Sequence, residues 1–134
     1  MLLPCWLSRL MAGQGEDLGG KGERIAARRL KSTGYEIIDR NRRVGRDEAD
    51  LIALAPDGRT LVIIEVKTRA DDAIDPFANI HRTKRAHLAR IAARLQRRRE
   101  YRDRPIRFDA VAVVIRPGEE PEVRHIEAAF ESPF

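Results

Sequence analysis

The sequence contains a single cysteine, Cys5, so the chain cannot form a disulfide bond within itself. A protein without internal disulfides suits the reducing cytoplasm. No stretch reaches the ~18 consecutive apolar residues of a membrane-spanning helix, so we expect neither a membrane span nor a membrane partner. The apolar opening at residues 1–7 is too short for a secretory signal peptide and lacks its basic start. These absences predict a cytoplasmic protein.

Several motifs of common catalytic and ligand-binding sites are also missing. The three histidines, His81, His87 and His125, are scattered, and with one cysteine they offer no zinc ligand set. No nucleophile of a Ser-His-Asp arrangement is recognisable. The glycines at residues 19–22 are not a phosphate-binding P-loop, because no Gly-Lys-Ser/Thr follows them. Zinc sites, serine hydrolases and P-loop enzymes are therefore not supported.

The bulk composition describes one basic domain. The chain has 134 residues, enough for a single domain with a hydrophobic core. Its net charge is +5, which favours a polyanionic partner such as nucleic acid, or only solubility. We expect one domain over residues 15–128, a poorly ordered leader over residues 1–14 and a tail over residues 129–134.

The spacing of apolar residues predicts the order helix, three strands, helix, one strand and a short edge strand. Such an alternation predicts an α/β fold, with a mixed central sheet flanked by helices. The expected helices cover residues 15–34 and 79–100; the expected strands cover residues 35–44, 47–54, 60–68, 106–115 and 122–126. A polar connection is expected between the third strand and the second helix.

Two apolar runs flank a turn signal at residues 56–58 and predict a β-hairpin. A loop of two or four residues centred there gives one register, with Asp50 opposite Glu65 and Glu48 opposite Lys67. A loop with an odd number of residues would move Asp50 to the other face, unless a bulge corrected the shift.

Facing carboxylates at Asp50 and Glu65 need an explanation. Like charges directly opposite each other are destabilising, so the pair needs a proton, a cation or deep solvation. A divalent metal on oxygen ligands, with Lys67 beside it, is one answer and would be Mg²⁺ or Mn²⁺. The alternative is a charged hairpin face on which Lys67 neutralises Glu65 or Glu48.

Two further acids fall where apolar residues are expected. Glu23 lies on the small apolar stripe of the first helix. It is either an ordinary first-turn acid favoured by the helix dipole or an extra carboxylate pointed at the Asp50 and Glu65 site. Asp109 interrupts the last buried strand, where we expect it to pair with an arginine rather than hold a metal.

Basic residues gather on the first strand and the second helix. On the strand they form a solvated edge or contact phosphates, and Lys84 either extends along the apolar stripe or reaches the hairpin site. The helix arginines lack interspersed acids, so i,i+4 ion pairs do not explain them and a nucleic-acid backbone is a natural partner. The candidate nucleic-acid-binding residues are Arg42, Arg43, Lys84, Arg85, Arg94 and Arg98.

The hairpin acids and Lys67 resemble the PD-(D/E)XK nuclease signature, with Asp50 on one strand and Glu65-Val66-Lys67 on the next. A wider pattern surrounds this signature: Gly22-Glu23, Asn41-Arg42-Arg43, Glu48-Ala49-Asp50-Leu51-Ile52-Ala53, Glu65-Val66-Lys67-Thr68-Arg69, Lys84 and Arg107-Phe108-Asp109. With these residues the chain resembles the bacterial YraN family over about residues 15–115. This resemblance implies the restriction-endonuclease-like fold, shared with Holliday junction resolvases and tRNA-splicing endonucleases.

The chain departs from the YraN pattern at two positions. Asp47 stands where the pattern usually has glycine, and Ala49 where it usually has isoleucine. Neither change removes a candidate metal ligand.

These features predict a Mg²⁺- or Mn²⁺-dependent endonuclease that hydrolyses phosphodiesters, with DNA favoured over RNA and structured DNA as one substrate form. Asp50 and Glu65 would hold the metal, Lys67 would act on the attacking water or the developing charge, and Glu23 would hold a water or a second ion. A homodimer would be needed to cut both strands symmetrically. The alternatives are a non-catalytic nucleic-acid-binding module and a protein-interaction domain.

Overall fold

The computed structural model describes residues 17–71 and 82–131. The predicted leader, most of the polar connection, the start of the second predicted helix and the last residues of the tail lie outside them. The elements in chain order are α2 (Leu18–Ser32), β1 (Glu36–Val44), β2 (Asp47–Leu54), β3 (Leu61–Arg69), α3 (Arg82–Leu95), β4 (Ile106–Val114) and β5 (Glu122–Phe130). The predicted α/β class, mixed sheet and order of elements are confirmed.

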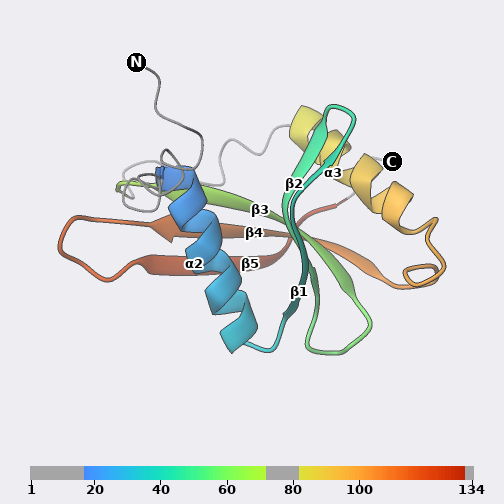
Figure 1. The fold of residues 1–134 in the computed structure, drawn as a ribbon, viewed down its shortest axis with the longest axis horizontal. Helices are drawn as coiled ribbons and strands as arrows, with labels where there is room; N and C mark the ends of the chain where they lie inside the picture. Colours follow the sequence, from blue (N-terminus) through green and yellow to red (C-terminus); the bar gives the residue numbers. More distant parts are fainter. Residues whose placement is uncertain (1–16, 72–81, 132–134) are drawn as a thin grey trace, which may run out of the picture.

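The five strands form one sheet in the order β1-β2-β3-β4-β5. Neighbouring strands are antiparallel except β3 and β4, which run parallel because α3 lies in the crossover between them. The central strands β3 and β4 carry near-continuous apolar runs, as expected for strands covered on both faces. Figure 1 shows the β1–β2 hairpin bending away from β3, β4 and β5.

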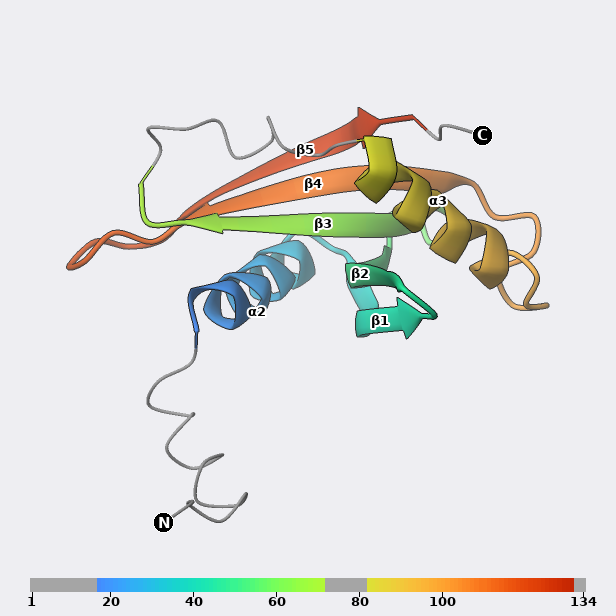
Figure 2. The same cartoon turned by 90° about the horizontal axis from the view of Figure 1, so that it is seen from above.

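The two helices pack against different sets of sheet side chains. Leu30 of α2 lies in one buried cluster with Val62 and Ile64. Leu88 of α3 lies in a second buried cluster with Ile63. Because successive strand residues point to opposite faces, the helices cover opposite faces of β3. Figure 2 shows them toward different ends of the sheet.

The β2–β3 hairpin has the register predicted from its turn. Leu54 pairs with Leu61, and the ladder continues to the pair Leu51 and Ile64. The carboxylate of Asp57 holds the turn by accepting hydrogen bonds from the backbone N–H groups of residues 59 and 60 at 2.8 and 2.9 Å. An even-residue loop therefore sets which side chains meet beyond the end of the ladder.

The second predicted helix ends earlier than expected. Within the described residues α3 stops at Leu95 rather than near residue 100. Residues 96–100 are all exposed, so no buried side chain holds a further turn of helix in place. Arg98 therefore lies in the turns that follow α3.

The predicted short edge strand is longer than expected. It continues to Phe130, so residues 129–130 are strand and not tail. The Phe130 ring stacks on Phe108 with a centroid distance of 5.1 Å, and this buried contact secures the end of β5.

Candidate active site

The strands β2 and β3 separate at the two predicted acids. Their ladder ends at Leu51 and Ile64, and Asp50 and Glu65 are the next residues along each strand. Beyond that point the Val66 N–H donates to Asp50 Oδ2 at 2.8 Å. An aspartate side chain thus replaces a strand carbonyl and bridges the opening.

Glu65 is a buried carboxylate held between two lysines. Its side chain is 7% exposed, with Oε1 3.4 Å from Lys67 Nζ and Oε2 3.3 Å from Lys84 Nζ. Lys84 Nζ also donates to the Glu48 carbonyl at 3.1 Å, so α3 is tied to β2 here. Asp50, Glu65, Lys67 and Lys84 form what we call the Glu65 cluster.

The pKa of Glu65 is raised to about 7. Burial is the main cause, and the nearby Asp50 charge adds to it, while Lys84 and Lys67 oppose the rise. Glu65 Oε2 is buried and accepts no hydrogen bond of good geometry, although Lys84 lies near it. A buried oxygen of this kind has spare capacity for a cation.

Glu23 reaches the edge of the Glu65 cluster from α2. Its pKa is raised, first by partial burial and then by the Asp50 charge, while a hydrogen bond from the Asn41 side chain opposes the rise. The structure therefore places Glu23 within electrostatic reach of Asp50. The sequence left open whether Glu23 is a first-turn acid or a carboxylate pointed at the hairpin; α2 begins at Leu18, so Glu23 is not in its first turn.

Gly22 allows α2 to approach the sheet this closely. A Cβ atom built on Gly22 would lie 2.7 Å from Thr68 Cβ, a distance that real side chains do not tolerate. Thr68 follows Lys67 on β3, so the contact sets the distance between α2 and the strand that carries Glu65.

Asn41 belongs to this site but was not among the candidate site residues predicted from the sequence. It lies within β1 at a φ of 50°, the left-handed region that asparagine tolerates better than most residues. Its neighbours Arg40 and Arg42 pair with Leu51 and Ala49, so Asn41 lies opposite Asp50. An asparagine inside an otherwise strand-like run was the available signal.

The pairing of Glu48 with Lys67 is not observed. The β2–β3 ladder ends before it, and Glu48 Oε2 instead lies 3.6 Å from an Arg43 nitrogen, while Lys67 turns to Glu65. The strands have separated by this point, so residues in register no longer face each other. Lys67 thus belongs wholly to the Glu65 cluster.

A second contact missed from the sequence fixes α3 beside the cluster. Arg90 donates to both Asp47 oxygens at 3.0 and 2.8 Å, and this pairing lowers the pKa of the carboxyl. Because Asp47 begins β2, the pair holds α3 against that strand and so helps place Lys84.

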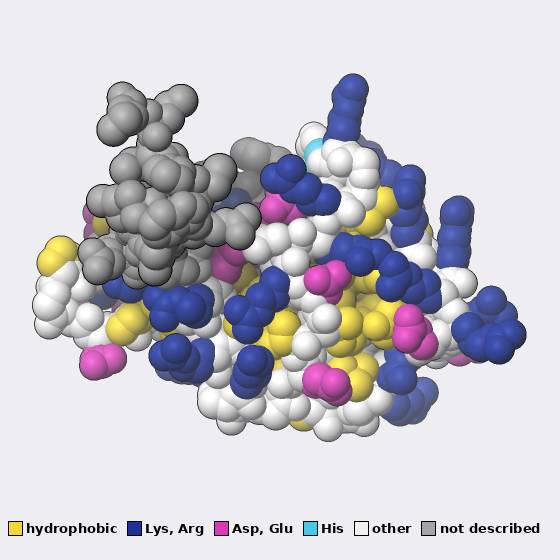
Figure 3. All heavy atoms as spheres, viewed as in Figure 1, with side chains coloured by type: hydrophobic (Ala, Val, Ile, Leu, Met, Phe, Trp, Pro, Cys, Tyr) yellow, Lys and Arg dark blue, Asp and Glu magenta, His cyan; other side chains and the backbone are white. Residues whose placement is uncertain are grey.

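The predicted nucleic-acid-binding residues separate into groups. Lys84 belongs to the Glu65 cluster, Arg43 pairs with Glu48, and Arg85 lies over the Phe130 ring at 5.5 Å. The three others, Arg42, Arg94 and Arg98, line one hollow between β1 and α3. Figure 3 shows Lys and Arg outnumbering acids over much of one face of the molecule.

Asp109 has the partner predicted for it. Arg107 donates two hydrogen bonds to its carboxylate, both at 2.8 Å, and His125 Nε2 lies 2.7 Å from Oδ2. The Ala128 N–H donates a further bond at 3.0 Å. Asp109 is completely buried and satisfied, so it supports the sheet.

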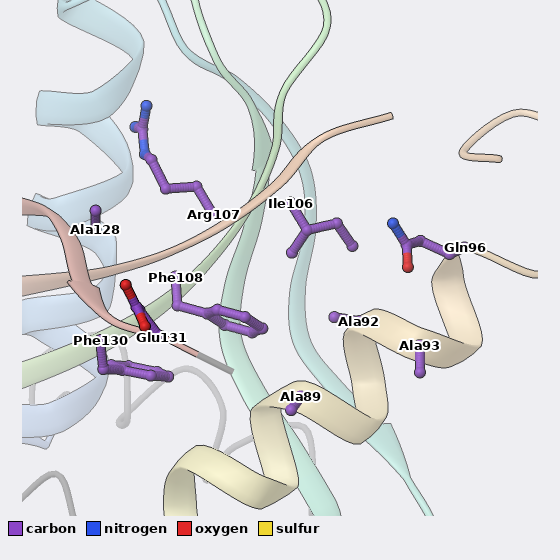
Figure 4. Close-up of a pocket in the computed structure, with 10 residues that line it drawn as sticks. All are labelled: Ala89, Ala92, Ala93, Gln96, Ile106, Arg107, Phe108, Ala128, Phe130 and Glu131. Carbon is purple, nitrogen blue, oxygen red and sulfur yellow. The ribbon is translucent and has the colours of Figure 1, made fainter. Parts of the chain in front are cut away.

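An apolar hollow of about 400 Å³ lies between α3 and the strands β4 and β5 (Figure 4). Its lining includes Ala89, Ala92, Phe108 and Phe130. It contains none of the residues of the Glu65 cluster, so we assign no catalytic chemistry to it.

The donor set for a metal consists of two carboxylates. Within residues 17–71 and 82–131 no group of three or more His, Cys, Asp or Glu side chains is arranged to hold a metal ion. Mg²⁺, however, usually takes only one or two protein carboxylates and keeps several waters. Asp50 and Glu65, with one oxygen of Glu65 lacking a hydrogen bond, fit that mode of binding.

Comparison with known proteins identifies the family. The model of the "Uncharacterised protein family UPF0102" matches residues 22–113. The chain belongs to this family. The resemblance to the YraN family is thereby confirmed, since UPF0102 and YraN denote one family.

UPF0102 relatives cover most of this chain. One from Geotalea uraniireducens is 39% identical over 117 residues, 87% of this chain and 91% of the relative. One from Chlorobaculum tepidum is 41% identical over 119 residues, which cover 84% of this chain and 91% of the relative. One from an Arthrobacter strain is 43% identical over 110 residues, which cover 81% of this chain and 92% of the relative. The match to the family model includes the Glu65 cluster, Glu23 and Asn41 but ends before β5.

Neither α2 nor α3 is long and apolar enough to cross a bilayer.

Proposed function

We propose that the protein is a metal-dependent nuclease that hydrolyses phosphodiester bonds in DNA. The observation that carries the proposal is the Glu65 carboxylate, buried and next to Asp50 and two lysines at the point where β2 and β3 separate. Perturbed acids of this kind are concentrated at functional sites. The restriction-endonuclease-like core, shared with Holliday junction resolvases, favours DNA as the substrate.

Asp50 and Glu65 would hold Mg²⁺ or Mn²⁺. The ion would lower the pKa of water and stabilise charge on the phosphate oxygens. Asp50 offers Oδ1 for this, because Oδ2 already accepts the Val66 N–H. Glu65 must be ionised to bind a cation, so a site with a pKa of about 7 fills as the pH rises through neutrality.

The lysines would act on the substrate. The side chains of Lys67 and Lys84 are 21% and 30% exposed, so both are partly open to solvent while their ammonium groups face Glu65. A phosphate at the carboxylates would meet both, and Lys67 would orient or deprotonate the attacking water or stabilise the developing negative charge. Glu23, across from Asp50, would hold a water or a second ion.

The test is cleavage of linear, flapped and junction DNA with Mg²⁺ or Mn²⁺ by the wild type, Asp50→Asn and Glu36→Gln. We expect Asp50→Asn to lose at least about 100-fold in rate, because a metal-holding carboxylate is removed. Glu36→Gln changes an exposed acid on β1 and should cut normally. No metal-dependent cleavage of any substrate, or equal cleavage by Asp50→Asn, would refute the proposal.

A non-catalytic nucleic-acid-binding module is the second candidate. The observation that favours it is that Lys67 and Lys84 already lie against both oxygens of Glu65. It predicts DNA binding that depends on salt but not on metal. Absence of DNA binding even at low salt would refute both nucleic-acid functions and leave a protein-interaction domain.

A further inference from the structure

A basic hollow separate from the Glu65 cluster lies between β1 and α3. It encloses about 200 Å³ and is lined by Arg42, Arg94 and Arg98, with Val44, Ile91 and Leu95 as its apolar part. Among the described residues no acid lines it. Its three arginines come from a strand, a helix and the turn that follows the helix.

The guanidinium groups retain unused donors. Arg42 NH1 binds Asp39 Oδ2 at 3.2 Å, but its Nε is buried and has no hydrogen-bond partner. Among residues 17–71 and 82–131, Arg94 and Arg98 make no side-chain hydrogen bond or ion pair within 4 Å. Asp39 binds Arg42, and Asp47, which is paired with Arg90, also interacts with the charge of Arg94. At least one buried N–H, the Nε of Arg42, awaits an acceptor.

Guanidinium groups arranged in this way suit a phosphate. Each presents a planar fork of donors that matches phosphate oxygens, and the apolar part of the hollow strengthens the attraction by limiting solvent. The volume is several times the ~30 Å³ that one water occupies in the liquid, so a phosphate group has room.

The hollow and the Glu65 cluster are linked by two elements. Arg42 pairs with Ala49, the residue before Asp50, across β1 and β2. Lys84 and Arg94 lie on α3, separated by about 15 Å along the helix axis at ~1.5 Å per residue. A few nucleotides of one strand span such a distance.

We infer that Arg42, Arg94 and Arg98 form a phosphate site that holds one backbone phosphate of DNA a few nucleotides from the phosphate at the Glu65 cluster. The inference rests on the proposed function for its ligand, DNA. With α3 setting the distance, the two sites together would place a strand across β1 and β2. This site adds affinity and register, and it reads no base.

The first test is DNA binding in EDTA across a salt series, so that hydrolysis plays no part. We compare Arg94→Gln, Arg98→Gln and the double variant with Arg97→Gln, Arg99→Gln and their double variant. The control arginines are exposed and lie outside the hollow. Unfolding curves are to be recorded for each variant, so that a loss of binding is not mistaken for a loss of folding.

Loss of one shared phosphate has a distinct signature. Each hollow variant should bind duplex DNA about tenfold more weakly at moderate salt and lower the slope of log K against log salt by about 0.9. The double variant should add little to either single one, because both remove the same phosphate contact. Equal effects of the control variants, or fully additive effects, would overturn the inference.

A second test uses inorganic phosphate as competitor. Phosphate should weaken DNA binding more in the wild type than in Arg94→Gln. Binding of inorganic phosphate that leaves DNA affinity unchanged would mean a site for a free anion and would overturn the assignment to DNA.

The two proposals fail separately. If Asp50→Asn cuts like the wild type while Arg94→Gln still lowers the salt slope, the nuclease proposal is refuted and the phosphate site is supported. If cleavage depends on Asp50 and Arg94→Gln binds DNA like Arg97→Gln, the phosphate site is refuted and the nuclease proposal is supported.

Discussion

Two buried carboxylates of this sheet have opposite environments. Asp109 on β4 is completely buried, accepts hydrogen bonds from Arg107 and Ala128, contacts His125, and has a lowered pKa. Glu65 on the neighbouring β3 is almost as buried, yet one of its oxygens lacks a hydrogen bond and its pKa is raised to about 7.

The comparison separates a buried charge that supports the fold from one that is available for chemistry. The hydrogen bonds and charges of its partners lower the pKa of Asp109 by more than desolvation raises it. Tyr35 and Glu127 extend this network, because they hydrogen-bond to each other and both contact Arg107. Around Glu65, desolvation and Asp50 outweigh two lysines. A folded protein tolerates such a site when a ligand or a function compensates for it.

The largest expected effect comes from breaking the satisfied site. Asp109→Asn removes the charge that pairs with Arg107 and His125, and we expect a loss of about 3–5 kcal/mol in the free energy of unfolding near neutral pH. Because the pKa of Asp109 is lowered in the folded protein, its contribution is present above the unfolded pKa and is lost as the pH falls through the folded value.

Urea unfolding at several pH values measures this, and the cost of Asp109→Asn should shrink in acid. Glu127→Gln is a matched control, since that acid is 62% exposed and lies 3.8 Å from Arg107. A cost for Asp109→Asn no larger than for Glu127→Gln would contradict the structural role of Asp109.

A smaller loss of stability is expected from a change that disturbs only the close packing of α2 against β3, the strand that carries Glu65. Gly22→Ala brings a methyl group against Thr68, and we expect about 1–3 kcal/mol of destabilisation from overpacking. The control is Gly19→Ala, where the nearest atom to the new methyl is 4.0 Å away and a helical alanine should stabilise by about 0.5–1 kcal/mol. Urea unfolding that shows the same gain for both variants would refute the close contact.

The smallest effect on the free energy of unfolding is expected from neutralising Glu65. Unlike the loss of the Asp109 charge, this change should stabilise the protein. The folded pKa of about 7 lies above the ordinary value of 4.5, so between these pH values only the folded state binds the proton. Wild-type stability therefore falls as the pH rises across that window.

The variant Glu65→Gln has no carboxyl group at this position, so its stability should not fall with pH in this way. In EDTA at about pH 8 it should be more stable than the wild type by about 1–2 kcal/mol, and near pH 4 the two should agree. Unfolding in urea at both pH values is the measurement. A Glu65→Gln variant that is less stable at high pH would show that the lysines fully compensate the charge.

Sequence reasoning predicted the parts of the site that follow from local periodicity. The alternation of strand side chains and an even-residue turn were enough to bring Asp50 and Glu65 together. Asp109 was expected to pair with an arginine, and the structure gives Arg107, two residues earlier on the same face of β4, as that partner.

The remaining features depend on tertiary geometry. No local rule shows that the β2–β3 ladder ends at Leu51, or that Glu48 turns to Arg43 instead of Lys67. The end of α3 depends on where its buried contacts stop, and that end decides which arginines share a hollow. Asn41 was among the residues that carry the family resemblance, but only its place within a strand pointed to an unusual backbone conformation.

The hydrogen bond between Asp50 and the Val66 amide gives the sheet a built-in reporter. Any ligand that binds the Asp50 carboxylate changes the strength of this hydrogen bond, which spans the gap between the separating strands. The rate at which the Val66 amide proton exchanges with solvent would thus report whether a ligand occupies the carboxylates, without a label and without turnover.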